Sequence, residues 1–421
     1  MEGYTLGVLA TITGLIVVLC LLVISSRSIV HLIFNFLYKR IMTENYWSNL
    51  FETYNLAKMV GLGRLVETEL RSAHGLPPAR PFGRRQTLSP WKDLLFNPVY
   101  LHRAPLLDYT KIGTEVVIGP VAQRPLKLKI PILIGGMAYG TALSAQTKQA
   151  LALGATMAGT ATNTGNGPFL PAERTAAEKL IIQYSRGSWA KDLEVLQEAD
   201  AIEIQLGQGL WGPSPVEIPA SRLARNPKLR KLLGAKPGEE AEIPPRLLEA
   251  QTDRELRELV AELRAKSGGV PVGFKLGASQ WLEREMEILV RANPDFIALD
   301  GLEGGTHGGI GSTLDYLGTP TLYAVVRARH FLEKKKLTGK ISLLVGGGLY
   351  SPMDFLKAMT LGADAVFIGT IALLALVHTQ AVKVLPWEPP TTLVFNQGRL
   401  KQKLQIDQGA QSLPNFLKAS A

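Results

Sequence analysis

Eight short apolar runs between residues 130 and 370 constrain the fold more than any other feature of this chain. They are IPILIGG at 130, ATMAGTAT at 155, LIIQYS at 180, AIEIQLG at 201, VPVGFKLG at 270, DFIALDG at 295, ISLLVGG at 341 and AVFIGT at 365. Each is followed by a glycine or polar loop and a helix-patterned segment, which is typical of a parallel sheet covered by helices. Eight such units close a barrel, so the sequence predicts an α/β fold of the (β/α)8, or TIM barrel, type.

Two of the intervening helices carry start signals. Thr252 and Glu255 form a capping box before LVAELRAK, while Ser351 supplies a cap and Asp354 an acidic third residue before FLKAMTL. Gly362 is expected to end the second helix.

The segment from Tyr4 to Ser25 holds 22 residues without a charge, long enough to cross a hydrocarbon core of ~30 Å. We therefore expect an N-terminal transmembrane helix. A cleaved signal peptide is the alternative, but it would have a basic leading region and a small-residue cleavage site. SIVHLIFNFL at 28–37 is too short to cross again and predicts either an interfacial helix or a buried helix of the soluble domain.

The net charge of +10 is concentrated near this apolar segment. Residues 27–130 contain 15 Lys and Arg against 7 Asp and Glu, a placement that favours an anionic membrane surface over nucleic acid. Arg27, Lys39 and Arg40 follow the span, so the positive-inside rule predicts a single-pass protein with a cytoplasmic catalytic domain.

The expected organisation has four parts: a membrane anchor with a juxtamembrane helix (1–45), a helical and linker arm (46–95), the barrel (96–384) and a C-terminal extension (385–421). Residues 72–91 are dense in Pro, Gly and Arg, and PWEPP opens the extension, which we expect to wrap the barrel and end in a helix. The single cysteine, Cys20, excludes a disulfide framework, a cluster bound by this chain's thiolates alone and a cysteine-rich zinc site.

The loops after the barrel strands are rich in glycine, and in such barrels these loops form the working face. Gly346, Gly347 and Gly348 follow the seventh strand, and Gly369 and Thr370 follow the eighth. Glycines let backbone N–H groups approach an anion, and a helix N-terminus adds attraction, so this pair of loops predicts a phosphate cradle. The alternative is that the glycines serve tight turns only.

Lys275 lies near the end of the fifth strand among apolar neighbours, where an ammonium needs an anionic partner. A flavin's pyrimidine edge, which gains negative charge on reduction, is one such partner; a salt bridge to Asp300 is the alternative. The long loop from Asp300 to Gly309 presents Glu303 and can lie against a planar ring. His307, in this loop, is a lone candidate for a base or a metal ligand.

Two further strand ends offer groups to a heterocycle. Met137, Ala138 and Tyr139 after the first strand provide backbone donors and acceptors, and Gln205 at the end of the fourth provides a neutral amide.

Together, in order and on these strands, the motifs resemble the FMN-binding synthase domain of glutamate synthase over roughly residues 96–380. The matching stretches are Gly136-Met137-Ala138-Tyr139-Gly140, Asn163-Thr164-Gly165-Asn166-Gly167, Asp300-Gly301 with Gly304-Gly305-Thr306, and Val345-Gly346-Gly347-Gly348-Leu349 with Gly369-Thr370. The anchor and the PWEPP tail resemble the single-chain, membrane-tethered members of that family.

The sequence departs from the family pattern at three places. Asn166 replaces the family's loop Glu, and Gln208-Gly209-Leu210-Trp211-Gly212-Pro213 lacks the Lys expected near 2-oxoglutarate. The cluster cysteines and the catalytic cysteine of the glutaminase domain have no counterpart, since Cys20 lies in the apolar segment. Arg186 still matches the family's Arg and is expected to bind a substrate carboxylate.

The resemblance implies an FMN oxidoreductase that converts 2-oxoglutarate, through 2-iminoglutarate, to glutamate or a close variant. It implies an external electron donor such as ferredoxin or a partner subunit. It further implies that Lys275 stabilises reduced FMN and that Asp300 or Glu303 supports proton transfer. The expected cofactor-binding residues are Met137, Ala138, Tyr139, Asn163, Gln205, Lys275, Gly304, Gly305, Thr306, Gly346, Gly347, Gly348, Gly369 and Thr370.

Two alternatives stay open. One is a different FMN barrel reaction on a small carboxylate, such as 2-hydroxy acid oxidation with His307 as the base, or isopentenyl diphosphate isomerisation. The other is a non-catalytic membrane subunit of a redox complex, which the rewritten loops at Asn166 and Leu210 favour.

Overall fold

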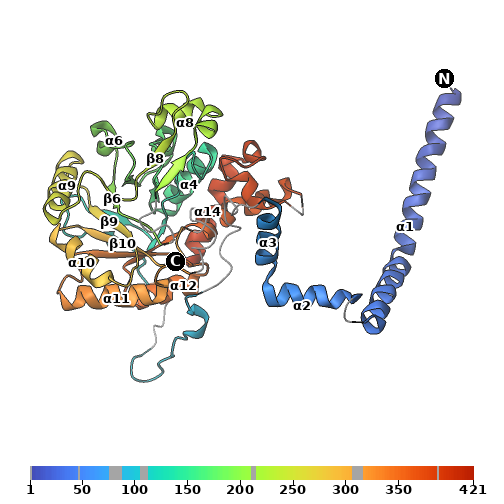
Figure 1. Ribbon diagram of the computed structural model, residues 1–421, viewed down its shortest axis with the longest axis horizontal. Helices are drawn as coiled ribbons and strands as arrows, with labels where there is room; N and C mark the ends of the chain where they lie inside the picture. The colour runs from blue at the N-terminus through green and yellow to red at the C-terminus, as the bar shows by residue number, and fades with distance from the viewer. Residues whose placement is uncertain are drawn as a thin grey trace. The chain divides into compact units, whose positions relative to one another are not determined.

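The computed structural model describes residues 2–45, 48–74, 88–104, 112–209, 215–305, 316–385 and 388–421 (Figure 1). The chain divides into two compact units, Met1–Ala79 and Arg80–Ala421. The finer boundaries expected at residues 45, 95 and 384 stay predictions.

The first unit contains α1 (Glu2–Thr43), α2 (Leu50–Val60) and α3 (Leu62–His74). The helix expected at 28–37 is present, and it forms part of α1, which continues through it. Between the two expected segments, Ser25 Oγ donates to Leu21 O at 2.5 Å and Ser26 Oγ donates to Val23 O at 2.6 Å. Both hydroxyls therefore bond to carbonyls of the same helix and do not interrupt it.

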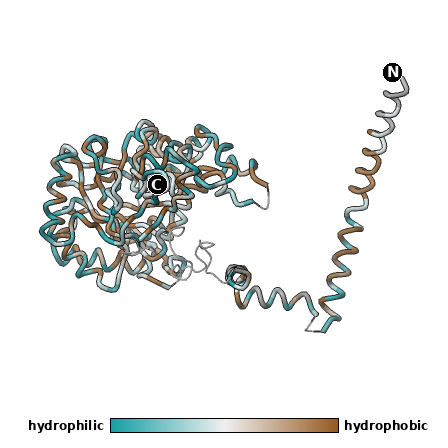
Figure 2. The backbone as a smooth tube through the Cα atoms, turned by 45° about the horizontal axis from the view of Figure 1, so that its top comes forward, coloured by the Kyte–Doolittle hydropathy of each residue, from teal (hydrophilic) through white to brown (hydrophobic). Residues whose placement is uncertain are grey.

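Within α1, the segment Thr11–Thr43 contains an 18-residue stretch with a mean hydropathy of 2.4, and no part of that stretch is buried. Apolar residues run along most of the helix (Figure 2). By length and composition this helix could cross a membrane, and the same properties fit an N-terminal signal sequence.

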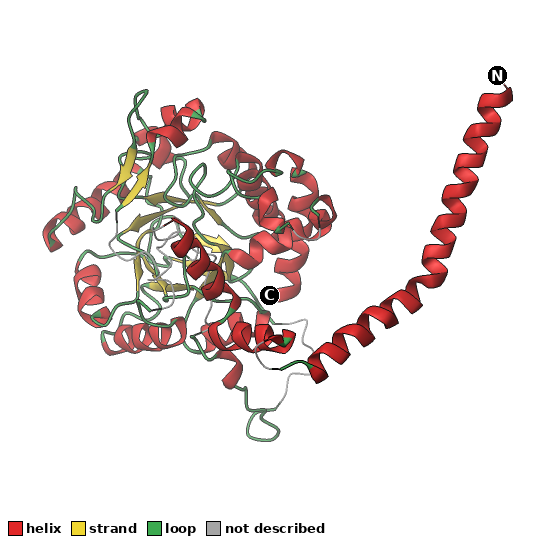
Figure 3. Cartoon of the chain, turned by 45° about the vertical axis from the view of Figure 1, so that its right-hand side comes forward, coloured by secondary structure: helices red, strands yellow, loops and turns green. Residues whose placement is uncertain are grey.

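The second unit is built on eight parallel strands with helices around them (Figure 3). In chain order the strands are β3 (Ile132–Ile134), β4 (Thr162–Asn163), β5 (Leu180–Tyr184), β6 (Ala201–Gln205), β9 (Val272–Gly277), β10 (Phe296–Asp300), β11 (Ser342–Gly346) and β12 (Ala365–Ile368). Their order in the sheet is β3-β12-β11-β10-β9-β6-β5-β4. Across the remaining seam the Ile134 N–H donates to Ala161 O at 3.0 Å, so the barrel is nearly closed.

Seven of the eight predicted strands coincide with their runs, and the second is displaced. Residues 155–158 form the last turn of α4 (Ala145–Ala158), which Gly159 ends at φ +72°, and the strand is only Thr162–Asn163. The run at 155 therefore contains a helix end, a left-handed glycine and only the first residue of the strand.

Helices cover the outside of the barrel. They are α4, α5 (Pro171–Ala176), α6 (Leu193–Gln197), α9 (Asp253–Lys266), α10 (Leu282–Arg291), α11 (Thr321–Lys334), α12 (Pro352–Thr360) and α13 (Thr370–Val377). Both capping signals are confirmed, Thr252 with Glu255 on α9 and Ser351 with Asp354 on α12. Gly362 follows α12 with φ +121°.

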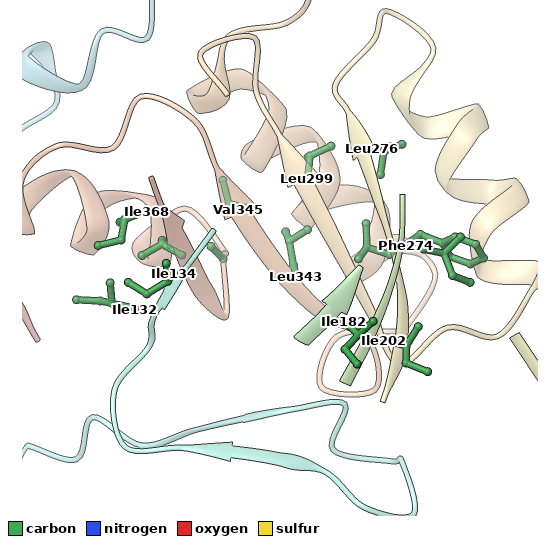
Figure 4. Close-up of a cluster of buried hydrophobic side chains, with 14 of the residues drawn as sticks. Ile132, Ile134, Ile182, Ile202, Phe274, Leu276, Leu299, Leu343, Val345 and Ile368 are labelled. Atoms are coloured by element: carbon green, nitrogen blue, oxygen red, sulfur yellow. The ribbon is translucent and has the colours of Figure 1, made fainter. Parts of the chain in front are cut away.

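Alternate residues of each strand face opposite sides of the barrel wall. Outward residues such as Ile182, Phe274 and Leu343 pack towards the helices (Figure 4). Inward residues form a second apolar cluster, which includes Leu133, Ile181, Ala201, Phe296, Ala298 and Leu344.

A hairpin of β1 (Val116–Ile118) and β2 (Leu126–Leu128) adds Ile118 and Leu128 to this inner cluster. The Gly119 N–H donates to Ser342 Oγ at 3.0 Å, at the start of β11. The hairpin thus covers the amino ends of the strands, which leaves the carboxyl ends for a site.

Three strand starts share one ion-pair arrangement. In each, an Asp just before a strand pairs with a helix Arg and also accepts the backbone N–H of a neighbouring residue at a strand start. The three sets are Asp200 with Arg174 and Leu180, Asp295 with Arg264 and Val272, and Asp364 with Arg329 and Leu343. The amino ends of the strands are therefore tied to the helices by charge-assisted bonds.

Two additions surround the barrel. Between β6 and β9 lie β7 (Val216–Ile218), α7 (Ala220–Ala224), α8 (Pro227–Leu232) and β8 (Ala241–Ile243), which share an apolar cluster with Tyr139, Leu170 and Trp189 of the barrel loops. After α13 come the short helices η4 (His378–Lys383), η5 (Pro390–Leu393) and η6 (Lys401–Lys403), then α14 (Ile406–Ser420), which packs on α4 and α13 (Figure 1). Pro386 and Trp387 of PWEPP lie outside the described residues.

Candidate active site

On the inward face of four strands, the residue two positions after an apolar core residue, towards the carboxyl end, is polar. Asn163 follows Ala161, Gln183 follows Ile181, Glu203 follows Ala201, and Asp300 follows Ala298, each two residues on. We call the set the polar layer: Asn163, Gln183, Glu203, Gln205, Lys275 and Asp300, each at most 6% exposed. The layer lies towards the carboxyl ends of the strands, where sequence reasoning expected the site.

Lys275 and Asp300 form a buried ion pair, with 3.2 Å between Nζ and Oδ1. The ammonium also lies 5.3 Å from the centre of the Phe367 ring. Burial alone would lower the pKa of Lys275, but the charges of Asp300 and Glu203 outweigh it and the pKa is raised. The salt bridge that the sequence left as an alternative is therefore present, and it holds the lysine protonated within the barrel.

Glu203 lies at the centre of the polar layer, and sequence reasoning missed it. Its Oε1 accepts from Asn163 Nδ2 at 3.0 Å and from Gln183 Nε2 at 2.6 Å. Its Oε2 is buried and has no hydrogen-bond partner among the described residues. The signal was a single carboxylate within the apolar run AIEIQ, on the inward side of the strand.

Gln205 provides a second unsatisfied acceptor. Its Nε2 donates to Gln208 Oε1 at 3.2 Å, while Oε1 is buried without a hydrogen-bond partner in the part of the chain that the structure describes. Two buried acceptors without donors in one polar layer are costly unless a ligand supplies the N–H groups.

The loops after β3 and β4 pack against each other. Gly165 has φ +67°, and a Cβ there would lie 2.7 Å from the backbone of Met137 and Ala138. Asn163 Oδ1 accepts the Gly165 N–H at 2.8 Å, so one side chain joins this loop to Glu203. The Tyr139 ring packs in the β7–β8 apolar cluster, where burial raises its pKa. Only its backbone remains available to a ligand.

A fully buried ion pair supports the β4 loop from behind. Lys148 Nζ lies 2.8 Å from Glu173 Oε1, and both side chains are at most 2% exposed. The same ammonium donates to Asn163 O at 2.8 Å and to Thr164 O at 3.3 Å. Burial raises the pKa of Glu173, and the charge of Lys148 opposes this effect.

Glu303 is tied to the start of α11. Its Oε2 accepts from Thr321 N at 2.9 Å and from Thr321 Oγ1 at 2.7 Å, which satisfies donors at the helix N-terminus. Its Oε1 is buried, and no described residue bonds to it. The Thr321 hydroxyl oxygen also lies 2.9 Å from Gly347 O, so its one proton is shared between Gly347 O and Glu303, and Glu303 and Thr321 together join the loops after β10 and β11.

The glycines of these loops serve close packing as well as any ligand. A Cβ on Gly347, which has φ +110°, would lie 2.7 Å from the Gly304 N, and one on Gly305 would lie 3.1 Å from Gln208 Nε2. Gly346 and Gly348 are similarly close to Asp300 and Glu303. Thr306 and His307 lie outside the described residues.

Only one of the two expected phosphate loops has a helix start without a side-chain cap. The N-terminus of α12 is capped by Ser351. At α13, Gly369 is the N-cap without a side-chain bond, and a Cβ there would meet only Met137 Sδ, at 4.0 Å. The first-turn N–H groups from Thr370 onwards are therefore the better anion site.

Arg186 follows β5 and is 2% exposed. Its Nη1 donates to Pro245 O at 2.6 Å, and burial lowers the pKa of the guanidinium. Within the described ranges, no group of three or more His, Cys, Asp or Glu side chains could hold a metal ion.

A parallel barrel that is closed at its amino ends and carries buried charges near its carboxyl ends has the layout of a (β/α)8 enzyme. The family model described as "Conserved region in glutamate synthase" matches residues 101–421. The chain therefore belongs to the glutamate synthase family of oxidoreductases.

Curated relatives agree with this assignment. The chain is 33% identical over 315 residues to a "Glutamate synthase large subunit-like protein" of Rhizobium meliloti, covering 74% of this chain and 70% of the relative. It is 29% identical over 301 residues to the "Archaeal-type glutamate synthase [NADPH]" of Thermotoga neapolitana, covering 70% of this chain but only 58% of that relative. A solved mandelate oxidase carrying an FMN adduct aligns at 16% identity with a TM-score of 0.42, over 75% of this chain and 81% of that one; this likeness is too low to carry an argument.

Proposed function

We propose that this chain is an FMN-dependent oxidoreductase of the glutamate synthase type, which reduces 2-iminoglutarate, formed from 2-oxoglutarate, to glutamate or a close variant. The observation that carries the proposal is the polar layer. A protonated Lys275 lies there beside the unsatisfied acceptors Glu203 Oε2 and Gln205 Oε1. Family membership supplies the reaction class.

The residues fit FMN at both ends of the cofactor. The flavin's pyrimidine edge has one N–H donor, which can bond to one of the open acceptors on Glu203 and Gln205, and two carbonyls, which can accept from the ammonium of Lys275. The uncapped start of α13 at Gly369 suits the phosphate. When bound, FMN supplies the electron pair that reduces the substrate.

The chain's own groups provide charge, orientation and protons. Lys275 keeps its proton because two carboxylates face it, and Asp300 fixes the direction of the Nζ–H bonds. Arg186 is a buried cation that a substrate carboxylate would stabilise. Reduction of the imine adds an electron pair and two protons, and Asp300 or Glu303 Oε1 is the proposed proton-transfer group.

The substrate loops of this chain depart from the family pattern, and its proposed electron donor is external. Asn166 stands where the family has a carboxylate, and residues 210–214 of the rewritten loop lie outside the described residues. We propose an external donor, ferredoxin or a partner subunit. One relative, from Pyropia yezoensis, is named ferredoxin-dependent; this chain matches 17% of its length at 25% identity.

We further propose that α1 anchors the enzyme as a single-pass helix, with the barrel in the cytoplasm. The apolar segment Thr11–Thr43 and the basic residues around its end support this topology. Extraction of membranes at alkaline pH tests it, because an integral helix stays in the pellet and a cleaved leader leaves a soluble protein.

The test of the function uses the full chain purified in detergent. The released cofactor is identified by mass, the protein is reduced anaerobically, and reoxidation is followed by flavin absorbance after adding 2-oxoglutarate with ammonium. Reoxidation together with glutamate formation is the expected result. If 2-hydroxy acids reduce the flavin instead, the protein is a 2-hydroxy acid oxidase and the proposed glutamate synthesis is wrong. Failure to bind FMN after reconstitution would favour a non-catalytic subunit of a redox complex.

A further inference from the structure

The turn after Met137–Tyr139 is held by a segment from the far end of the chain. The turn, residues 140–144, contains Gly140 at φ +80°, whose N–H donates to Leu143 O at 2.9 Å. The Leu143 N–H donates to Ala138 O at 2.9 Å. The conformation of the turn therefore determines where the backbone of Met137 and Ala138 lies.

Asn396 bonds to this turn twice. Its Nδ2 donates to Gly140 O at 2.8 Å, and its backbone N–H donates to Ala142 O at 2.8 Å. Next to it, Leu143 forms an isolated antiparallel bridge with Phe395. The C-terminal segment therefore extends the turn by one short piece of antiparallel pairing.

The segment that carries Asn396 is itself fixed. Val394 is completely buried, and its carbonyl accepts the Ser144 N–H at 3.0 Å and the Thr147 hydroxyl at 2.9 Å. Lys401 Nζ donates to Asn396 O at 2.6 Å and approaches Asn396 Oδ1 at 3.3 Å. Asn396 is thus presented to Gly140 by a rigid support, and its amide orientation is set by Lys401.

We propose that Asn396 is a positioning residue for the cofactor site: it holds the Gly140 turn so that the Met137–Ala138 backbone faces FMN. The inference rests on the proposed function, since it concerns the cofactor named there. It makes the C-terminal segment part of the site, although that segment lies more than 250 residues from Met137 in the sequence.

The chain offers a matched control for this bond. Gln380 Nε2 donates to Gln405 O at 3.0 Å, and Gln380 Oε1 accepts from Lys383 Nζ at 2.9 Å. Asn396 and Gln380 therefore share a backbone-carbonyl acceptor and a lysine partner in the same C-terminal region. N396D and Q380E each replace the donor with an oxygen and keep the lysine contact.

The first measurement is FMN affinity, by fluorescence quenching on the cofactor-stripped full chain. We expect the Kd of N396D to rise by about tenfold or more, because a carboxylate oxygen would face Gly140 O without a proton. Arg222 also donates to Gly140 O, at 3.2 Å, and could approach the new carboxylate, so N396A is measured as well. Q380E and Q380A are expected to bind FMN as the wild type does.

The second measurement is amide hydrogen exchange over residues 138–144 without FMN. Faster exchange there in both Asn396 variants, and not in the Gln380 variants, is expected whether or not FMN is the ligand. If the wild type binds no FMN, the proposed function fails while exchange still tests the positioning of the turn. Equal losses of affinity in the Asn396 and Gln380 variants, or unchanged exchange at the turn, would overturn the inference.

Discussion

Replacing Lys148 with methionine tests how the buried ion pair supports the β4 loop. The ammonium lies 2.8 Å from Glu173 Oε1 and donates to Asn163 O, and both side chains are at most 2% exposed. Methionine keeps the unbranched stem but removes the charge and its bonds. Glu173 is then left buried without its counterion, which costs about 3–5 kcal/mol. That is a large share of a total of about 5–15 kcal/mol for a typical protein.

The loss is expected to depend on pH in a definite direction. Burial raises the pKa of Glu173 above 4.5 and Lys148 opposes the rise, so the variant raises it further. A carboxyl group whose pKa is higher in the folded state stabilises the fold below its unfolded pKa, and that contribution is lost as pH rises through the folded pKa. The deficit of K148M should therefore grow from mildly acid to neutral and alkaline pH.

The assay is denaturant unfolding of the full chain in detergent, followed by circular dichroism at several pH values from about 5 to 8. Glu173→Gln in the K148M background removes the buried charge and should abolish the pH dependence. The apolar pair Lys148→Met with Glu173→Leu should recover most of the stability. A K148M deficit below about 1 kcal/mol, or one equal at every pH, would refute the reasoning.

Three further predictions concern the site, the barrel and the anchor. Lys275→Met leaves Asp300 without its cation and should weaken FMN binding about tenfold or more, with slower flavin reduction; unchanged values in a titration and in stopped-flow reduction would remove Lys275 from the cofactor site. Asp295→Asn loses the ion pair with Arg264 at 2.9 Å and should cost about 1–2 kcal/mol in unfolding without changing FMN affinity, since the pair lies at the amino ends of the strands. Deleting residues 2–43 should move the protein from the membrane pellet to the supernatant, and retention in the pellet would mean that another surface binds lipid.

The sequence predicted what depends on local pattern. The apolar runs located the barrel strands, and the caps at Thr252 and Ser351 located two helices, because these signals need only nearby residues. The second strand was displaced because an alanine-rich run suits the end of a helix as well as a strand. The apolar segment and the helix at 28–37 form one continuous helix, since the Ser25 hydroxyl bonds within that helix and does not interrupt it.

Side-chain contacts with residues that are distant in the sequence could not be predicted from the sequence alone. The sequence placed Lys275 at a strand end but left two candidate partners, FMN and Asp300. The ion pair with Asp300 depends on the register of β9 against β10, which the sequence alone does not give. Glu203 was missed because its partners, Asn163 and Gln183, come from two other strands. The position of the Tyr139 ring also depends on distant residues, since it joins a cluster that residues after β6 help to build.

The buried polar atoms at the two ends of the barrel differ in whether they have hydrogen-bond partners. At the amino ends, the carboxylates of Asp200, Asp295 and Asp364 each bond to an arginine and to a backbone N–H. In the polar layer, Glu203 Oε2 and Gln205 Oε1 have no donor among the residues that the structure describes. Because an unsatisfied buried acceptor costs about 1–3 kcal/mol, this arrangement destabilises the empty protein, and a ligand that supplies N–H groups relieves the cost. The same free energy would then contribute to cofactor affinity, and for this reason we propose that the open acceptors, more than the glycines, mark the cofactor's position.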